Sequence, residues 1–269
     1  MNSTSTRGAT TPLGLVEHIK SRAPHSVSLI VPTRNEAANI RPLVARVTAA
    51  MSRTDWHWEL VFVDDSDDDT PDVVSTLERL GDQVRLRWRA PRERSGGLSG
   101  AVTAGFADAR GEVFAVIDGD LQHPPELLPS LLAPLASGSA DLVVASRYAG
   151  TDADSAGLAS RYRRIASHAG RLAAHVFFKR TRTVSDPLGG YFALRRSVVD
   201  DADLQPHGFK ILLEVLVRGH WTSVVEVPYK FAERATGTSK AGWREGVRFA
   251  RHVVRLQAGT ARHGQAAER

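Results

Sequence analysis

The sequence predicts a three-layer α/β domain with a mostly parallel central sheet and a C-terminal amphipathic helix. From Val27 onward, short β-branched runs alternate with amphipathic segments of helical length, which is typical of a parallel sheet covered by helices. The chain has 269 residues, of which 42% are hydrophobic and 24% charged, enough for one large domain with a proper core. We expect a folded domain over residues 26–240, between a flexible leader over 1–25 and a basic amphipathic helix with a frayed tail over 241–269.

The first half of the domain contains five expected strands, each a short run rich in β-branched residues. They are Val27–Val31, Glu59–Asp64, Val84–Trp88, Val113–Asp118 and Asp141–Ala145. The segments between them have apolar residues at helical spacing and predict helices. These helices are Glu36–Met51, Pro71–Leu80, Leu98–Ala109 and Pro125–Ala136.

The pattern changes after Ala145, where the strict alternation of strand and helix ends. A long helix, a turn, a short strand and a second helix are expected in that order, over Leu158–Phe178, Asp186–Gly190, Tyr191–Leu194 and Phe209–Arg218. A strand over Val224–Tyr229 and a helix over Gly242–Gln257 complete the chain, and residues 258–269 are expected to fray.

Composition excludes several classes of protein. The absence of cysteine excludes disulfide scaffolds, thiolate zinc sites and cysteine nucleophiles. No run approaches the roughly 18 apolar residues that a membrane span needs, and the Ser- and Thr-rich start lacks the apolar core of a signal peptide, so a cytoplasmic location is expected. The net charge of +5 permits nucleic acid, an anionic membrane or a phosphate-bearing substrate as partner.

Acidic residues close two of the expected strands. Asp118 and Asp120 follow one apolar strand, and such a pair can hold a hard divalent cation through oxygen. Alone, the pair fits an ordinary surface turn better than a metal site. A second acidic strand end, Asp64 and Asp65, favours a nucleotide diphosphate, because ligands of open α/β sheets lie at the carboxyl ends of strands.

Two further segments are ambiguous by themselves. Ile30 to Glu36 reads as a strand-to-helix turn in which Asn35 caps the following helix. The segment from Gly96 to Gly105 is rich in glycine and opens a helix, but it lacks the G-x-G-x-x-G spacing and follows the third strand. A dinucleotide-binding oxidoreductase is therefore not expected.

Together these segments resemble glycosyltransferase family 2, and more closely its polyprenol-phosphate mannose synthase branch. The resemblance covers roughly residues 26–242. The matching motifs are Pro32–Glu36, Val63–Thr70, Gly97–Gly105, Asp118–Gln122, Ala145–Tyr148, Asp186–Tyr191, Glu226–Pro228 and Glu233–Lys240. Several motifs in the right order and spacing are far more specific than any one of them.

The resemblance implies a nucleotide-sugar transferase fold of the Rossmann-like GT-A type, and it assigns site residues one by one. The nucleotide pocket would be lined by Pro32, Arg34, Glu36, Asp64 and Asp65, with Arg34 standing where the family usually has an aromatic residue. Mg²⁺ or Mn²⁺ and the diphosphate would be held by Asp118, Asp120 and Gln122. The phosphate groups of donor and acceptor would be held by Arg147, Arg163, Ser167, Arg234 and Lys240, which with Asp120 form the expected catalytic set.

The function implied is inverting, metal-dependent transfer of a hexose, with mannose from GDP-mannose as the expected donor, onto a polyprenyl phosphate at the cytoplasmic face of the membrane. Two alternatives stay open: a soluble transferase acting on a hydroxyl acceptor, and a non-enzymatic interaction protein on the same fold. Glu214, on an expected helix, could face a sugar hydroxyl or be a solvated or salt-bridged glutamate.

Two basic stripes predict contact with an anionic membrane surface. Along helical spacing they run through Arg164, His168, Arg171, His175 and Lys179, and through Arg244, Arg248, Arg251 and Arg255. Apolar residues, including Leu172, Val176 and Val254, are expected on the opposite faces, as in helices that lie on membranes. No motif that reads DNA or RNA accompanies this charge, so nucleic acid is not an expected partner. The sequence leaves open whether a separate membrane protein anchors the chain.

Overall fold

The computed structural model describes residues 26–150, 161–230 and 249–257, with the backbone alone in 161–166. Its strands are β1 (Ser26–Thr33), β2 (His57–Asp64), β3 (Val84–Trp88), β4 (Val113–Val116), β5 (Leu142–Ser146), β6 (Phe192–Arg195) and β7 (Val224–Pro228). Its α-helices are α1 (Ala37–Met51), α2 (Thr70–Glu78), α3 (Gly97–Asp108), α4 (Leu128–Ala136), α5 (Arg161–Phe177) and α6 (Ile211–Arg218). A further helix over 249–257, called here the C-terminal helix, ends the described part.

The strands form one seven-stranded sheet in the order β3-β2-β1-β4-β6-β5-β7. Strands β1 to β4 run parallel to one another, and β5 runs parallel to β7. Strand β6 is antiparallel to both of its neighbours, β4 and β5. The mostly parallel sheet is therefore confirmed, and the antiparallel strand lies where the alternation of strand and helix stops in the sequence.

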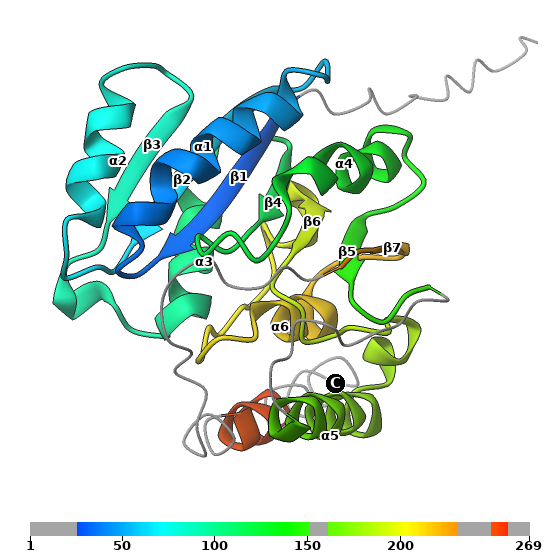
Figure 1. Ribbon diagram of the computed structural model, residues 1–269. Coiled ribbons are helices and arrows are strands. Elements are labelled where there is room, and N and C mark those ends of the chain that lie inside the picture. The colour runs from blue at the N-terminus through cyan, green and yellow to red at the C-terminus, as the bar shows by residue number, and fades with distance from the viewer. Residues whose placement is uncertain (1–25, 151–160, 231–248, 258–269) are drawn as a thin grey trace, which may run out of the picture.

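Helices cover both faces of the sheet and make the three expected layers (Figure 1). Apolar residues of α1, α2 and α4 pack on one face in a core that includes Leu29 and Phe62. Helices α3 and α6 pack on the other face in a core that includes Ile30 and Val61. Adjacent strand residues enter opposite cores because side chains alternate along a strand.

Helix α3 approaches the sheet closely at Gly105, which ends the glycine-rich segment noted in the sequence. A Cβ atom added there would lie 2.5 Å from Cγ2 of Ile30 on β1 and 3.1 Å from a methyl group of Val63 on β2. Only glycine allows this approach without displacing the buried strands. This segment thus serves packing of the helix that follows the third strand.

The C-terminal helix lies beside α5, and the two form a pair at one side of the domain (Figure 1). Val253 and Leu256 of the C-terminal helix share a small core with Ala174 and Phe178 at the end of α5, and with Leu213 on α6. The pair is thereby joined to the domain through α6. Within the described residues, none of the helices combines the length and apolar character needed to cross a bilayer.

The basic residues expected along α5 are divided between solvent and the domain in the described part of the chain, where His168 and Lys179 are exposed. Arg171 and His175 are half-buried, and His175 Nε2 lies 3.0 Å from the carbonyl oxygen of Val184. Leu172 and Val176 are instead 64% and 59% exposed. The Arg171 guanidinium also lies 4.5 Å from the centre of the Tyr148 ring, so the side of α5 that faces the domain offers partners to basic side chains.

A buried polar cluster joins α6 to the C-terminal helix. Glu214 on α6 is 2% exposed, and its carboxylate lies 2.9 Å from Nε of Arg218 and 3.4 Å from Nε2 of His252. The backbone N–H of Gln205 donates to the same carboxylate at 2.9 Å. Glu214 is therefore salt-bridged to Arg218 within α6, and its carboxylate faces His252 of the C-terminal helix in this buried cluster.

Acidification is expected to loosen this junction. Burial lowers the pKa of His252 from 6.5 to about 4. Between these values the unfolded chain binds a proton that the folded chain does not, so the free energy of unfolding should fall as the pH falls from 6.5 toward 4. Melting temperatures at pH 7 and pH 5 should therefore differ more for the natural protein than for His252→Gln.

The comparison between the two proteins isolates His252 from Glu214. Burial raises the pKa of Glu214, so protonation of Glu214 at low pH acts in the opposite direction, and it does so in both proteins. An equal loss of melting temperature in the two would show that His252 does not cause the pH dependence.

Candidate active site

The site lies at the carboxyl ends of β1, β2 and β4, where polar residues follow buried strands. Asp64, the last residue of β2, is fully buried. Its carboxylate accepts hydrogen bonds from the hydroxyls of Thr33 and Ser66 at 2.7 and 2.6 Å and from the backbone N–H of Ser66 at 3.1 Å. Through these bonds Asp64 links the ends of β1 and β2, where the nucleotide pocket is expected.

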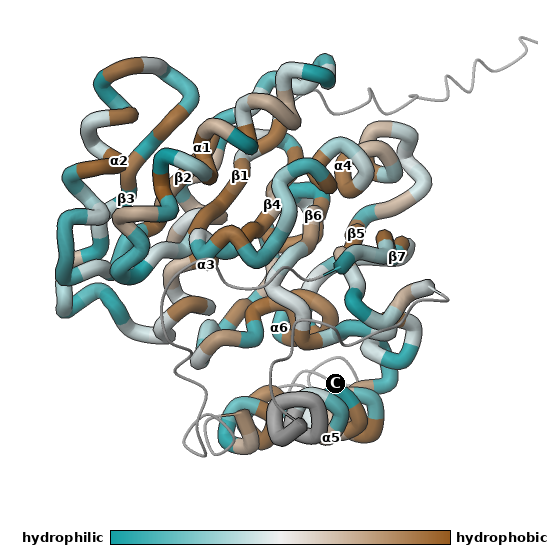
Figure 2. Tube along the Cα trace, viewed as in Figure 1, coloured by the Kyte–Doolittle hydropathy of each residue, from teal (hydrophilic) through white to brown (hydrophobic). Residues whose placement is uncertain are grey.

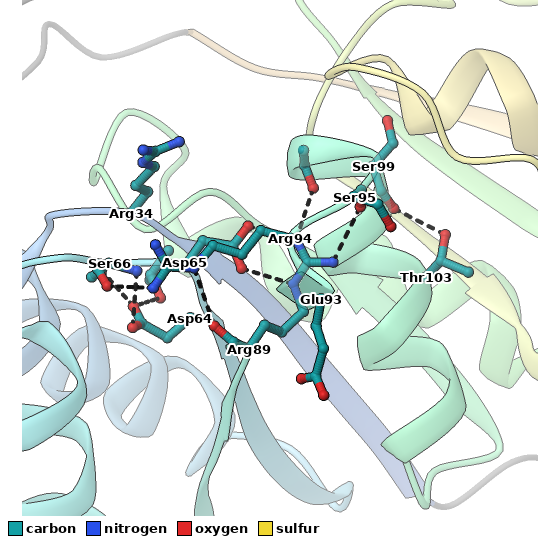
Figure 3. A network of polar contacts seen from close by, with 12 residues as sticks. Arg34, Asp64, Asp65, Ser66, Arg89, Glu93, Arg94, Ser95, Ser99 and Thr103 are labelled. Atoms are coloured by element: carbon teal, nitrogen blue, oxygen red, sulfur yellow. Dashed lines mark hydrogen bonds and ion pairs between the residues drawn. The ribbon is translucent and has the colours of Figure 1, made fainter. Parts of the chain in front are cut away.

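Asp65 is engaged by an arginine that the sequence did not single out. Arg89, which follows β3, donates through Nε and Nη2 to the two carboxylate oxygens of Asp65 at 2.7 and 2.5 Å (Figure 3). Both side chains are buried, and Arg89 also donates to the carbonyls of Ser95 and Gly97 at the start of α3. One guanidinium thus joins the ends of β2 and β3 to the loop that opens α3. The signal in the sequence is a charged residue directly after an expected strand.

The loop after β1 is cross-linked to the acidic run after β2. Asn35 has a φ of 60°, in the left-handed region, and its side-chain oxygen accepts the backbone N–H of Asp67 at 2.9 Å. The expectation that Asn35 caps the first helix is therefore wrong, because α1 begins at Ala37 and the Asn35 side chain bonds across to the neighbouring loop. Left-handed backbone at a non-glycine residue is a strained feature that clusters at functional sites.

Arg34 and Glu36 flank this turn and face different surroundings. The Arg34 side chain is 61% exposed, reaches Asp67 at 3.5 Å and extends away from the Arg89–Asp65 pair (Figure 3). Glu36 is half-buried, and its carboxylate accepts from the side-chain amide of Asn39 at 2.6 Å. Pro32, within β1, is buried. The five residues expected to line a nucleotide pocket thus gather around the ends of β1 and β2.

The Asp118 to Gln122 segment turns back on itself just beyond β4. Leu121 has a φ of 63°, and the backbone N–H of Gln122 donates to the Asp120 carboxylate at 3.1 Å. Asp120 is buried, whereas the Asp118 side chain is 30% exposed. Gly190 lies against Asp118, since a Cβ there would stand 3.0 Å from its Oδ2. The segment holds both carboxylates at one edge of the sheet, with a small residue opposite.

These residues fit a shared Mg²⁺ or Mn²⁺. The donor set of two carboxylates and the Gln122 side chain offers the oxygen ligands that hard cations prefer. Among the described residues, no group of three or more His, Cys, Asp or Glu side chains is placed to hold a metal. A cation at Asp118 and Asp120 would therefore need further oxygens, which phosphates of a bound nucleotide can supply.

His123 and Tyr229 are site residues that the sequence did not single out. His123 is 3% exposed, and its two ring nitrogens lie 3.1 Å from Asp118 Oδ2 and 3.0 Å from the Tyr229 hydroxyl. Burial raises the pKa of Tyr229, so its hydroxyl keeps its proton at neutral pH. The signal for His123 is its place directly after Gln122, within the turn that carries the acidic pair.

A second charged group lies beside this turn. Arg147, which follows β5, donates through Nε and Nη2 to the carboxylate of Asp186 at 2.7 and 2.9 Å. Burial alone would lower the pKa of Arg147, but the Asp186 bonds outweigh it and raise that pKa, so the guanidinium stays charged. The Tyr229 hydroxyl lies 3.0 Å from His123, which contacts Asp118, and the backbone N–H of Tyr229 donates to the carbonyl of Ser146, directly before Arg147. Tyr229 thus marks where the acidic turn and the expected phosphate-binding arginine meet.

The other expected phosphate-binding residues fall into two groups. Ser167 on α5 lies 2.9 Å from the hydroxyl of Tyr148, whose ring also lies beneath Arg147, so Ser167 and Arg147 meet at one side chain. The side chain of Arg163 lies outside what the structure describes, and so do Arg234 and Lys240.

Removing Arg89 should destabilise the site strongly. Arg89→Ala leaves the Asp65 carboxylate buried without its partner, which costs about 3–5 kcal/mol in free energy of unfolding. Arg92→Ala, which changes an exposed arginine of the same loop, should cost within about 0.5 kcal/mol. Urea denaturation of the two variants measures the difference, and equal midpoints would show that the Arg89–Asp65 pair does not hold the loop.

Comparison with known proteins identifies the family to which this chain belongs. The family model described as glycosyl transferase family 2 matches residues 28–202. The dolichol-phosphate mannosyltransferase of Pyrococcus furiosus is 39% identical over 232 residues, covering 86% of this chain but 63% of that protein. The protein of the same name from Saccharomyces cerevisiae is 36% identical over 243 residues, covering 85% of this chain and 86% of its own.

Solved structures share the fold at lower identity. Glucosyl-3-phosphoglycerate synthase from Mycobacterium tuberculosis, in complex with Mn²⁺ and uridine diphosphate, aligns with a TM-score of 0.59 at 20% identity, covering 86% of this chain and 78% of that one. Mannosyl-3-phosphoglycerate synthase from Rubrobacter xylanophilus aligns with a TM-score of 0.61 at 19% identity, covering 89% and 75%. The expected GT-A fold is confirmed. With its family model matched over most of the domain, the chain belongs to glycosyl transferase family 2 and is a glycosyltransferase.

Proposed function

We propose that this enzyme transfers mannose from GDP-mannose onto a polyprenyl phosphate, with inversion, at the cytoplasmic face of a membrane. The observation that carries the proposal is that Tyr229 connects two charged groups. Its hydroxyl lies 3.0 Å from His123, which contacts Asp118, and its backbone N–H donates to the carbonyl of Ser146, next to the Arg147–Asp186 pair. A donor diphosphate with its cation suits the first group, and an anionic acceptor suits the second. The names of the relatives from Pyrococcus and Saccharomyces support the same acceptor class.

The site residues form two groups in this proposal, one that binds the donor and one that binds the acceptor. Pro32, Arg34, Glu36, Asp64 and Asp65 line the nucleotide pocket, and Asp118, Asp120 and Gln122 hold the diphosphate end. When bound, Mg²⁺ or Mn²⁺ supplies positive charge against the leaving diphosphate. Arg147, Arg163, Ser167, Arg234 and Lys240 bind phosphate groups and orient the acceptor for in-line attack.

This acceptor removes the need for a side chain that takes a proton. The second ionisation of a phosphate monoester has a pKa near 6, so its attacking oxygen is already largely anionic at neutral pH. A hydroxyl acceptor, by contrast, needs a positioned base. Glu214 does not act as that base, since its carboxylate is buried against Arg218 and His252.

The test of function is a transfer assay. The full chain is incubated with labelled GDP-mannose or UDP-glucose, a polyprenyl phosphate and Mg²⁺ or Mn²⁺, and the organic phase is counted. Label should enter the organic phase from GDP-mannose, and only when the polyprenyl phosphate and cation are present. Label that stays in the aqueous phase on a glycan or a small molecule would contradict the proposal and favour a hydroxyl acceptor.

In this assay Asp120→Asn should abolish transfer, because a neutral amide loses the charge that holds the cation. Asp82→Asn, which changes an exposed acid in the loop before β3, is the matched control and should keep full activity. Melting temperatures show whether both variants fold. Normal turnover and metal dependence in Asp120→Asn would show that the metal site is misassigned.

We further propose that the enzyme meets an anionic membrane through an apolar patch formed by Leu172, Val176 and Phe177 on α5 and Val254 on the C-terminal helix. These side chains are from 48% to 66% exposed, on two helices that lie side by side (Figure 2). The exposed basic residues Lys179, Arg251 and Arg255 lie on the same two segments. Apolar side chains beside basic ones match the acyl and headgroup regions of an anionic bilayer.

Replacing Leu172, Val176 and Val254 by serine should weaken binding to vesicles that contain anionic lipid by at least about tenfold. Burial of even one such side chain contributes about 1.5 kcal/mol, which corresponds to that factor. Leu80→Ser is the matched control, because Leu80 is 76% exposed but lies after α2. Cosedimentation measures both variants, and equal binding would show that the patch does not touch the membrane.

A further inference from the structure

A line of hydrogen bonds crosses the active site from the acidic turn to the end of β7. Oδ2 of Asp118 lies 3.1 Å from Nε2 of His123, and Nδ1 of His123 lies 3.0 Å from the hydroxyl of Tyr229. The backbone N–H of Tyr229 donates to the carbonyl of Ser146 at 3.1 Å, immediately before Arg147. The line therefore begins at a residue of the donor side and ends beside the arginine of the acceptor side.

The imidazole in this line is held rigidly. Its ring centroid lies 5.2 Å from that of Tyr191 and 5.7 Å from that of Tyr229, and those two tyrosines meet edge to face at 6.0 Å. Tyr191 is fully buried, and its hydroxyl donates to the carbonyl of Pro124 at 3.1 Å. Packing thus fixes the ring plane of His123, and Tyr229 is the tyrosine whose hydroxyl reaches the imidazole.

The partners of His123 define which nitrogen carries the proton. An ionised carboxylate only accepts hydrogen bonds, so Nε2 of His123 must be the donor toward Asp118. In the neutral ring Nδ1 is then an acceptor, and the Tyr229 hydroxyl is placed to donate to it. A hydrogen bond from the Tyr229 hydroxyl thereby stabilises the tautomer that points an N–H at Asp118, which is the one that the carboxylate requires.

The restrained carboxylate is the exposed member of the acidic pair. Gly190 borders the same Oδ2 atom, and a Cβ at that position would lie 3.0 Å from Oδ2 and 3.4 Å from His123 Nε2. Oδ2 is thus confined between the imidazole and the Gly190 backbone. Removing a group that hydrogen-bonds to a metal-ligating side chain commonly lowers metal affinity by 10–100-fold.

We propose that His123 is a positioning residue for Asp118, and that Tyr229 sets the tautomer of His123. The inference rests on the proposed function, in which Asp118 helps to hold the cation and the donor diphosphate. His123 fixes the orientation of the carboxylate before the cation arrives, so that the ordering is achieved on folding and not on binding. Neither residue touches the reacting atoms.

The test measures Mn²⁺ binding to the full chain in the presence of GDP, by electron paramagnetic resonance. His123→Leu should weaken Mn²⁺ binding by about 10–100-fold. His123→Gln, whose amide can place an N–H near the position of Nε2, should recover most of the affinity. Tyr229→Phe should weaken binding in the same direction by a smaller factor.

Tyr191→Phe is the matched control for Tyr229→Phe. Both variants remove one hydroxyl from the same aromatic cluster, but the Tyr191 hydroxyl bonds to a carbonyl and not to His123. Tyr191→Phe should lower the melting temperature and leave Mn²⁺ affinity unchanged. In transfer assays, His123→Leu and Tyr229→Phe should raise the Mn²⁺ concentration needed for half-maximal rate more than they lower the rate at saturating Mn²⁺.

The outcomes separate this inference from the proposed function. If Asp118→Asn loses Mn²⁺ affinity while Tyr229→Phe matches Tyr191→Phe and His123→Gln is no better than His123→Leu, the positioning role is overturned and the metal assignment stands. If Asp118→Asn binds Mn²⁺ with GDP as the natural protein does, the metal assignment is overturned, and the role of His123 with it. If His123→Leu fails to fold, the difference in Mn²⁺ affinity between Tyr229→Phe and Tyr191→Phe tests the positioning role.

Discussion

Buried carboxylates at the carboxyl edge of the sheet must find hydrogen-bond donors, and the loops of the active site supply them. An unpaired buried charge is too costly to keep, so each acid binds a particular segment. Asp64 binds the ends of β1 and β2, Asp65 binds Arg89, and Asp186 binds Arg147. Glu226 on β7 accepts the backbone N–H and hydroxyl of Ser185. The acids that place the loops are largely distinct from the pair proposed to hold the cation.

This division bears on the proposed binding of a donor diphosphate at so acidic an edge. Arg89 and Arg147 neutralise Asp65 and Asp186 within the structure, so these carboxylates add little net negative charge to the site. The Arg147 guanidinium remains charged and is held by Asp186 in one orientation. Local pairing therefore sets the charge that a substrate meets at this edge.

The helix pair formed by α5 and the C-terminal helix exposes apolar side chains on its outer side. Its inner side places His175 against the carbonyl of Val184 and His252 beside the buried carboxylate of Glu214, and its outer side exposes Leu172 and Val254. Burying basic and imidazole groups while exposing leucine and valine is the reverse of what water alone favours. Exposed apolar groups of this kind mark an interaction surface, which agrees with the lipid-linked acceptor proposed for the enzyme.

The sequence by itself determined the α/β class, the boundaries of most elements and the motifs of the family. Period-two runs and helical spacing are local properties, so they could be read without a structure, as could the paired acids at Asp118 and Asp120. Local patterns do not report which residues far apart in the chain will be in contact. The antiparallel direction of β6, the Arg89–Asp65 pair and the contact between His123 and Tyr229 join residues far apart in the chain. Which side of α5 faces the domain is a property of the same kind, because a helix presents two faces and only the packed neighbours decide which of them is buried.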